Sequence, residues 1–149
     1  MKLNQSESKL FSKTCTGIAH CPTSNMRLAS GIAPVRDWVD LGVKVGLGVD
    51  GSSSNDSGHL LAEARQTMLL QRVKYGAEKF SAREALKIAT KGGAETLNRN
   101  DIGEISIGKA ADFAIYDLNQ IDMSGTFSDP IAGLIFCGPI KTKIGRAHV

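Results

Sequence analysis

The residue in this chain best suited to do chemistry is Asp50, which ends a short apolar run and opens a polar loop. The surrounding segment, residues 43–56, reads VKVGLGVDGSSSND. Its Val and Leu residues favour a buried strand, where a carboxylate is costly unless a cation or hydrogen-bond donors meet it. A carboxylate at the carboxyl end of a strand, before a polar loop and a helix, is typical of the active-site rim of an α/β barrel. The same position also suits an Asp that caps the next helix.

A second segment of the same design precedes the first. Residues 17–25 read GIAHCPTSN, a short apolar run that leads into His20, Pro22 and a polar loop that ends at Asn25. The recurrence of strand and polar loop favours the rim interpretation of Asp50 over the capping one. The serines at 52–54 are expected to be loop or cap residues, because no Gly-x-Ser-x-Gly nucleophile motif surrounds them.

Composition narrows the class of protein. The chain has 149 residues, 42% hydrophobic and 22% charged, which is ordinary for a globular protein. It has no run of about 18 apolar residues and no signal-peptide core at its start, so we expect no membrane span and a cytoplasmic location. Three cysteines without CxxC spacing argue against a disulfide framework or a thiolate zinc site. The net charge of +3 is too small and too scattered to predict a nucleic-acid partner.

The final residues, 143–149, have an unusual composition. The stretch IGRAHV that ends the chain can be written in codons that match a common sequencing adapter. We therefore expect residues 143–149 to be adapter-derived, although a natural basic tail stays an alternative, and His148 is given no role.

The hydrophobic pattern alternates between helix and strand and then changes character. Ser81 and Glu84 form a capping box, Pro34 suits a first helical turn, and Gly42 suits a helix end. The expected helices are residues 6–13, 34–41, 60–75, 81–89 and 94–97; the expected strands are 17–20, 43–49 and 111–116. The apolar run 131–136 is compatible with either a strand or a short helix. This order predicts α/β strand–helix units over residues 1–100 and a different, β-containing segment over 101–142.

Two strand–helix units cannot close a barrel, which needs eight. Isolated, they would leave strand edges with unpaired backbone groups. We therefore expect this sequence to be the carboxyl-terminal portion of a (β/α)8 TIM barrel followed by part of a small β-sandwich.

The motifs resemble those of the amidohydrolase superfamily. The segments HCPTSN (20–25), GIAP (31–34) and GLGVDG (46–51) are similar to its seventh and eighth strand regions, and GEISIGKAAD (103–112) to its return into a flanking β-sandwich. Within the superfamily, residues 51–57 and 65–72 most resemble the 8-oxoguanine deaminases and the triazine and hydroxyatrazine aminohydrolases.

This resemblance implies a metal-dependent hydrolase that deaminates a small nitrogen heterocycle. A divalent cation, zinc or iron, lowers the pKa of bound water, and the hydroxide displaces ammonia from the ring carbon. Asp50 matches the strand-eight Asp of the family, which binds the metal and transfers a proton. His20 and Asn25 match rim positions that contact substrate or hold the Asp50 loop. A homo-oligomer is compatible with this family.

The sequence also departs from the family pattern. The metal site of the family needs a His-x-His pair and further histidines, whereas this chain has only His20, His59 and His148. His59 is expected to cap or precede a helix. We therefore expect no activity from these residues alone. A chlorohydrolase, another aminohydrolase, or a non-catalytic half-barrel that pairs with a second polypeptide remain alternatives.

Overall fold

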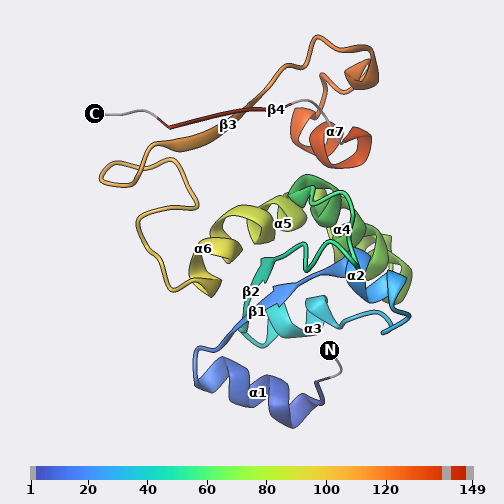
Figure 1. Ribbon diagram of the computed structural model, residues 1–149, viewed down its shortest axis with the longest axis vertical. Coiled ribbons are helices and arrows are strands. Elements are labelled where there is room, and N and C mark those ends of the chain that lie inside the picture. Colours follow the sequence, from blue (N-terminus) through green and yellow to red (C-terminus); the bar gives the residue numbers. More distant parts are fainter. Residues whose placement is uncertain (1–2, 139–141, 147–149) are drawn as a thin grey trace.

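The computed structural model describes residues 3–138 and 142–146. Its secondary structure alternates helices and strands and ends in an antiparallel strand pair (Figure 1). The elements are α1 (Gln5–Lys13), β1 (Gly17–His20), α2 (Pro22–Arg27), α3 (Val35–Asp40), β2 (Lys44–Leu47), α4 (Leu60–Tyr75), a 3-10 turn (Ala77–Lys79), α5 (Ala82–Lys87), a π-helical turn (Ile88–Gly92), α6 (Gly93–Thr96), β3 (Asp112–Tyr116), a second 3-10 turn (Ile121–Met123), α7 (Pro130–Cys137) and β4 (Thr142–Arg146).

The centre of the fold is the parallel pair β1–β2. Ile18 lies opposite Val45, and His20 opposite Leu47. Beyond the last ladder pair, the Gly48 amide donates to the His20 carbonyl at 2.9 Å. In Figure 1 the pair lies between α1 and α3 on one side and α5 and α6 on the other. Both strands therefore end at the same edge, and the loops that follow them are neighbours.

Two glycines allow the helical run from α5 to α6 to pack directly on β2. A Cβ atom on Gly92 would lie 2.2 Å from the Val45 carbonyl oxygen, and one on Gly46 would lie 2.9 Å from the Gly93 Cα. Larger side chains would push the helix off the strand. Both the π-helical turn at Ile88–Gly92 and the helix α6 that follows it make this contact with β2.

The core gathers side chains from both strand–helix units and from α4. Its largest fully buried apolar members are Trp38, Phe80, Met68, Met123 and Ile135. The long helix α4 also buries a polar stripe at four-residue spacing, consisting of Glu63, Thr67 and Gln71. A buried polar side chain needs partners, and Glu63 and Gln71 find them in backbone and side-chain groups of the strand–helix units and the loop after β2, whereas the Thr67 hydroxyl has no partner among the described residues.

Gln71 fastens α4 to the start of α3. Its amide nitrogen donates to the Ala33 carbonyl at 3.0 Å, and its amide oxygen accepts the Arg36 backbone N–H at 3.1 Å. The position of α3 relative to α4 is thus set by a buried, fully paired amide as well as by apolar contact.

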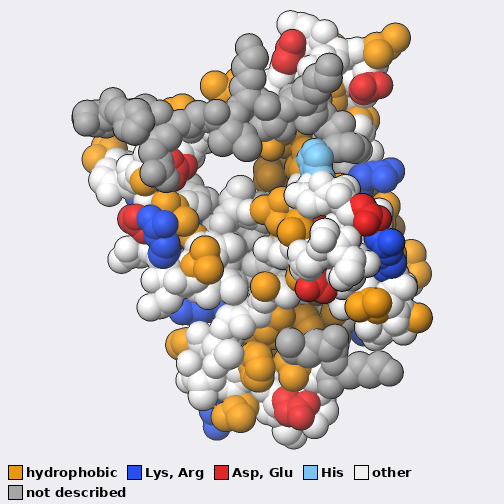
Figure 2. All heavy atoms as spheres, viewed as in Figure 1, with side chains coloured by type: hydrophobic (Ala, Val, Ile, Leu, Met, Phe, Trp, Pro, Cys, Tyr) orange, Lys and Arg blue, Asp and Glu red, His pale blue; other side chains and the backbone are white. Residues whose placement is uncertain are grey.

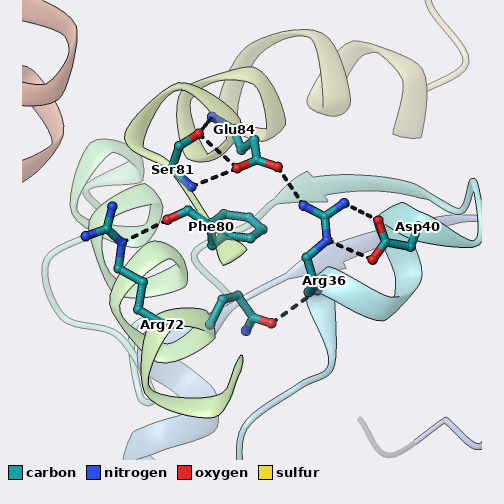
Figure 3. A network of polar contacts seen from close by, with 7 residues as sticks. Arg36, Asp40, Arg72, Phe80, Ser81 and Glu84 are labelled. Carbon is teal, nitrogen blue, oxygen red and sulfur yellow. Dashed lines mark hydrogen bonds and ion pairs between the residues drawn. The ribbon is translucent and has the colours of Figure 1, made fainter. Parts of the chain in front are cut away.

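The Arg36 side chain joins α3 to α5 (Figure 3). Its guanidinium binds both oxygens of Asp40 on its own helix, and its Nη1 donates to Glu84 Oε1 at 2.6 Å. Glu84 at the same time completes the capping box of α5, with Ser81 as the cap. The Arg36 side chain is 17% exposed, whereas its partners Asp40 and Glu84 are 62% and 40% exposed, so the network lies at the edge of the core.

The segment after α6 buries Met123 and one side of α7 in the core but leaves many other apolar side chains exposed. Among the side chains that the structure describes after α6, six large apolar ones are more than half exposed: Leu97, Ile105, Ile107, Ile115, Ile121 and Phe127. Figure 2 shows hydrophobic side chains open on the surface of the face it draws. The ribbon β3–β4 is antiparallel, with Tyr116 opposite Thr142, and within the described residues each sheet has two strands.

Most expected elements are confirmed, but β4 (Thr142–Arg146) was not expected, because residues 143–146 were assigned to the tail, and three further differences occur. The run 131–136, left open between strand and helix, lies in helix α7, which Asp129 caps. The pattern missed α2, and it treated the continuous run through the π-helical turn as two separate helices. Residues 147–149 of the expected tail, with His148, lie outside the described residues. Among the described residues, no helix combines the length and apolar character that a membrane crossing requires.

The Arg36 network gives a first prediction. R36Q should lower the free energy of unfolding by about 2 kcal/mol, because it removes charge-assisted bonds and leaves Glu84 facing a neutral group. The control is R27Q, which breaks the exposed Arg27–Asp56 pair and should change stability little. Urea unfolding of the purified protein measures both, and an equal loss in the two variants would contradict the prediction.

Candidate functional site

Asp50 lies in the loop directly after β2, at the carboxyl edge of the parallel pair. Its backbone adopts φ 61°, in the left-handed region. Asp tolerates this conformation better than most residues, but the conformation still costs about 1 kcal/mol or more. The side chain is exposed at this edge. The turn therefore presents a carboxylate to solvent at a strained position, which is common at functional sites.

Hydroxyl groups from two segments hold the Asp50 carboxylate. Ser24 Oγ, on α2, donates to Asp50 Oδ2 at 2.6 Å, and Ser54 Oγ, in the following loop, donates to the same oxygen at 3.1 Å. Together with the Gly51 backbone, these bonds hold the pKa of Asp50 below its ordinary value, the Ser24 bond having the largest effect. Among the described residues, the side-chain hydrogen bonds to Asp50 use Oδ2 alone.

One cavity brings the expected site residues together. It has a volume of about 240 Å³ and is lined by Ile18, Ala19, His20, Cys21, Asn25, Ala33, Trp38 and Asp50. His20 ends β1, Asn25 lies half-buried on α2, and Asp50 follows β2. The three residues that the sequence singled out therefore meet at one place.

His20 is a buried rather than an open member of this cavity. Its side chain is 3% exposed, and within the part of the chain that the structure describes its Nε2 has no hydrogen-bond partner. The same holds for Nε1 of Trp38, which is 1% exposed. Burial lowers the pKa of His20 to about 4, so the imidazole is neutral near pH 7. A neutral imidazole can accept or donate one hydrogen bond at Nε2, depending on its tautomer.

Cys21 and His59 have structural roles. Burial, followed by the nearby carboxylates of Asp50 and Glu63, raises the pKa of the Cys21 thiol, which therefore stays protonated and acts as a small packing residue. His59 caps α4, its Nδ1 accepting the Ala62 N–H at 3.4 Å, as the sequence predicted.

The side chains at this edge provide one candidate metal ligand, Asp50, and not a complete metal site. Asp50 has an accessible carboxylate at the strand edge, and a hard oxygen suits a divalent cation. A zinc site, however, needs three or four protein ligands. Over residues 3–138 and 142–146, no group of three or more His, Cys, Asp and Glu side chains is placed to hold a metal ion.

Sequence analysis missed the residues that hold Asp50. Ser24 looked like one of several loop polar residues, and Ser54 like a cap or loop serine. From the sequence, Glu63 had no expected role at the site, but its side chain is fully buried. A signal for Glu63 was present, because it falls in the helical stripe that continues through Thr67 and Gln71.

The arrangement of strands, loops and Asp50 agrees with comparisons to known proteins. The model of the amidohydrolase family matches residues 1–144. The chain belongs to the amidohydrolase family.

The relatives within this family include several enzymes. The 8-oxoguanine deaminase of Pseudomonas aeruginosa is 48% identical over 134 residues, which cover 90% of this chain and 30% of that protein. Hydroxydechloroatrazine ethylaminohydrolase of Pseudomonas sp. (strain ADP) is 39% identical, with coverages of 91% and 30%. The zinc-complexed crystal structure of atrazine chlorohydrolase from Arthrobacter aurescens superposes with a TM-score of 0.85 at 40% identity, with coverages of 91% and 30%. This amidohydrolase chain thus spans about 30% of the length of these relatives and has the fold of the matching part.

The buried His20 gives a second prediction. Between pH 6.5 and about 4 the unfolded chain binds a proton at His20 that the folded chain excludes, so stability falls as pH is lowered through this window and is unaffected above it. The full effect is about 3 kcal/mol. In a histidine NMR titration, the Cε1–H signal that disappears in H20Q should titrate near pH 4. A midpoint above pH 6 for that signal would contradict the prediction.

Proposed function

We propose that this chain forms the last strand–helix units of an amidohydrolase barrel that deaminates a small nitrogen heterocycle, either a purine of the 8-oxoguanine type or a triazine. In this proposal residues 1–100 belong to the barrel, residues 101–142 to a flanking β-sandwich, and residues 143–149 to an adapter-derived tail. The observation that carries the proposal is the single cavity at the carboxyl ends of β1 and β2 that His20, Asn25 and Asp50 line. The 48% identity to an 8-oxoguanine deaminase supports the substrate class.

Asp50 is proposed as the catalytic carboxylate and as one ligand of a divalent cation, zinc or iron. The bound cation would supply an activated water near neutral pH. Hydrogen bonds from Ser24 and Ser54 to Oδ2 keep Asp50 ionised and fix the orientation of its carboxylate. Oδ1 accepts no side-chain hydrogen bond from the described residues. The zinc in the atrazine chlorohydrolase crystal structure supports a metal in the complete protein.

His20 and Asn25 are proposed as substrate-binding residues. The neutral His20 imidazole has hydrogen-bonding capacity at Nε2 that no described residue uses, and purines and triazines carry ring nitrogens and exocyclic groups that can pair with it. The 40% identity to an atrazine chlorohydrolase supports a second candidate, hydrolytic dechlorination of a triazine.

Open strand edges support the proposal that further strands complete the barrel. In the described part of the chain, β1 and β2 pair only with each other, so each keeps one edge with unpaired backbone groups. Such edges pair readily with additional strands.

The single ligand leads to a third prediction. The purified 149-residue chain should bind zinc weakly and without a defined stoichiometry, because one carboxylate does not make a zinc site. Isothermal titration calorimetry measures this. A tight, stoichiometric site that disappears in D50N would contradict the proposal that the other ligands lie outside this sequence.

The catalytic role of Asp50 leads to a fourth prediction. In the complete enzyme that contains this chain, D50N should lower kcat for ammonia release by at least about a thousandfold, because the amide can neither accept the proton nor ligate the cation as well. The exposed Asp56 gives the control, D56N, which should keep kcat. Ammonia-coupled assays with 8-oxoguanine and with aminotriazines also distinguish the two substrate types, and full activity in D50N would refute the proposed function.

A further inference from the structure

Glu63 is a fully buried carboxylate whose two oxygens bind two different segments. Its side chain, on the first turn of α4, is 0% exposed. Oε2 accepts the Thr23 backbone N–H at 3.0 Å, and Oε1 accepts Asn55 Nδ2 at 2.9 Å. Burying an ionised carboxylate is costly, and these two donors offset only part of that cost. A carboxylate side chain at this buried position calls for a reason beyond packing.

The two segments that Glu63 joins are the ones that hold Asp50. Thr23 is adjacent to Ser24, and Asn55 is adjacent to Ser54. Ser24 and Ser54 are the two side chains that donate to Asp50 Oδ2. Glu63 therefore binds the chain one residue away from each Asp50 donor, once on α2 and once on the loop after β2.

We propose that Glu63 is a positioning residue that fixes the Asp50 carboxylate by holding both of its hydroxyl donors in place. This inference rests on the proposed function, because it matters for catalysis only if Asp50 acts on the reacting groups. Glu63 itself acts through Thr23 and Asn55. The same clamp orients α2, which carries Asn25, toward the cavity that Asp50 and Asn25 share.

The two hydrogen-bond donors that face Glu63 explain why position 63 requires a carboxylate. Both partners are donors, so both oxygens must accept. A glutamine would offer one oxygen and would place its N–H groups against the other donor. Asn55 cannot simply turn its amide around, because its Oδ1 already accepts from the Ser57 backbone N–H at 3.3 Å and from Ser57 Oγ at 3.1 Å.

Exchanging the amide and the carboxylate between positions 63 and 55 should restore the hydrogen bonds that E63Q loses. In N55D the new carboxylate would face Glu63, and two buried like charges repel. In the double variant E63Q/N55D the amide at position 63 can donate to the carboxylate at position 55 while its oxygen still accepts from Thr23. The carboxylate at 55 can still accept from Ser57. Net charge and the number of donors and acceptors are the same as in the original pair.

Gln71 provides a matched structural control. It lies two turns further along the same face of α4, is equally buried, and also makes two hydrogen bonds, but to Ala33 and Arg36 at the start of α3. Q71L should destabilise the protein as E63Q does, without loosening the Ser24 and Ser54 donors. Comparison of the two variants therefore separates lost stability from lost positioning.

The experiment measures kcat, KM and the urea unfolding midpoint of the complete enzyme for the wild type, E63Q, N55D, E63Q/N55D and Q71L. Under conditions where the variant is fully folded, we expect E63Q to lower kcat about 10- to 100-fold, because a small misplacement of a reacting group has an effect of this size. KM should change less than about threefold, because substrate contacts persist. The double variant should recover most of the lost kcat, whereas Q71L should keep kcat despite a lower unfolding midpoint.

The outcomes separate this inference from the proposed function. An active wild type with an unaffected kcat in E63Q, an equal kcat loss in Q71L, or no recovery in the double variant would overturn the positioning role of Glu63 alone. A wild type that releases no ammonia from purines or triazines would overturn the proposed function and, with it, this inference.

Discussion

Parallel pairing of β1 with β2 is the constraint on which the rest of this structure depends. The register places His20 opposite Leu47, and the Gly48 N–H extends the ladder past the last pair. Because both strands run in the same direction, α2 and the Asp50 loop begin at the same edge. A register shift of one residue would reverse which face each side chain occupies, and His20 would leave the cavity. The close contact of Gly92 with the Val45 carbonyl fixes the strand against its covering helix.

At this edge a second layer of polar contacts decides how the carboxylate is presented. Ser24 and Ser54 reach Asp50 from opposite sides of the sequence, and Glu63 binds next to both. The helix α4 thus serves as the support of the site: Glu63 holds the two loops, and Gln71 holds the start of α3. Glu63 and Gln71 take positions on α4 that apolar side chains would usually occupy. Their hydrogen bonds define the orientation of the segments that they contact. Fully paired buried polar groups can rigidify and specify one arrangement in this way.

The sequence predicted the parts of this arrangement that local chemistry determines. The strand at residues 17–20 and the helix at 60–75 were predicted with the bounds observed, and the capping box at Ser81 marked the start of α5. The helix α2 was missed because its six residues show no apolar periodicity, and the type of α7 stayed open because a short apolar run fits both structures. Asp50, His20 and Asn25 were found from strand ends and motif resemblance. The roles of Ser24 and Glu63 depend on contacts with partners 26 and 40 residues away, which no local pattern encodes.

The central claim is that Asp50 ligates a divalent cation in the complete enzyme, at the carboxyl edge shared by β1 and β2. The most direct measurement is a crystal structure of the complete enzyme grown with zinc, with anomalous diffraction recorded at the zinc edge. We predict an anomalous peak about 2.0–2.2 Å from an Asp50 carboxylate oxygen, with the Ser24 and Ser54 bonds to Asp50 retained. A zinc peak bound elsewhere, with the Asp50 carboxylate turned away from it, would contradict the account.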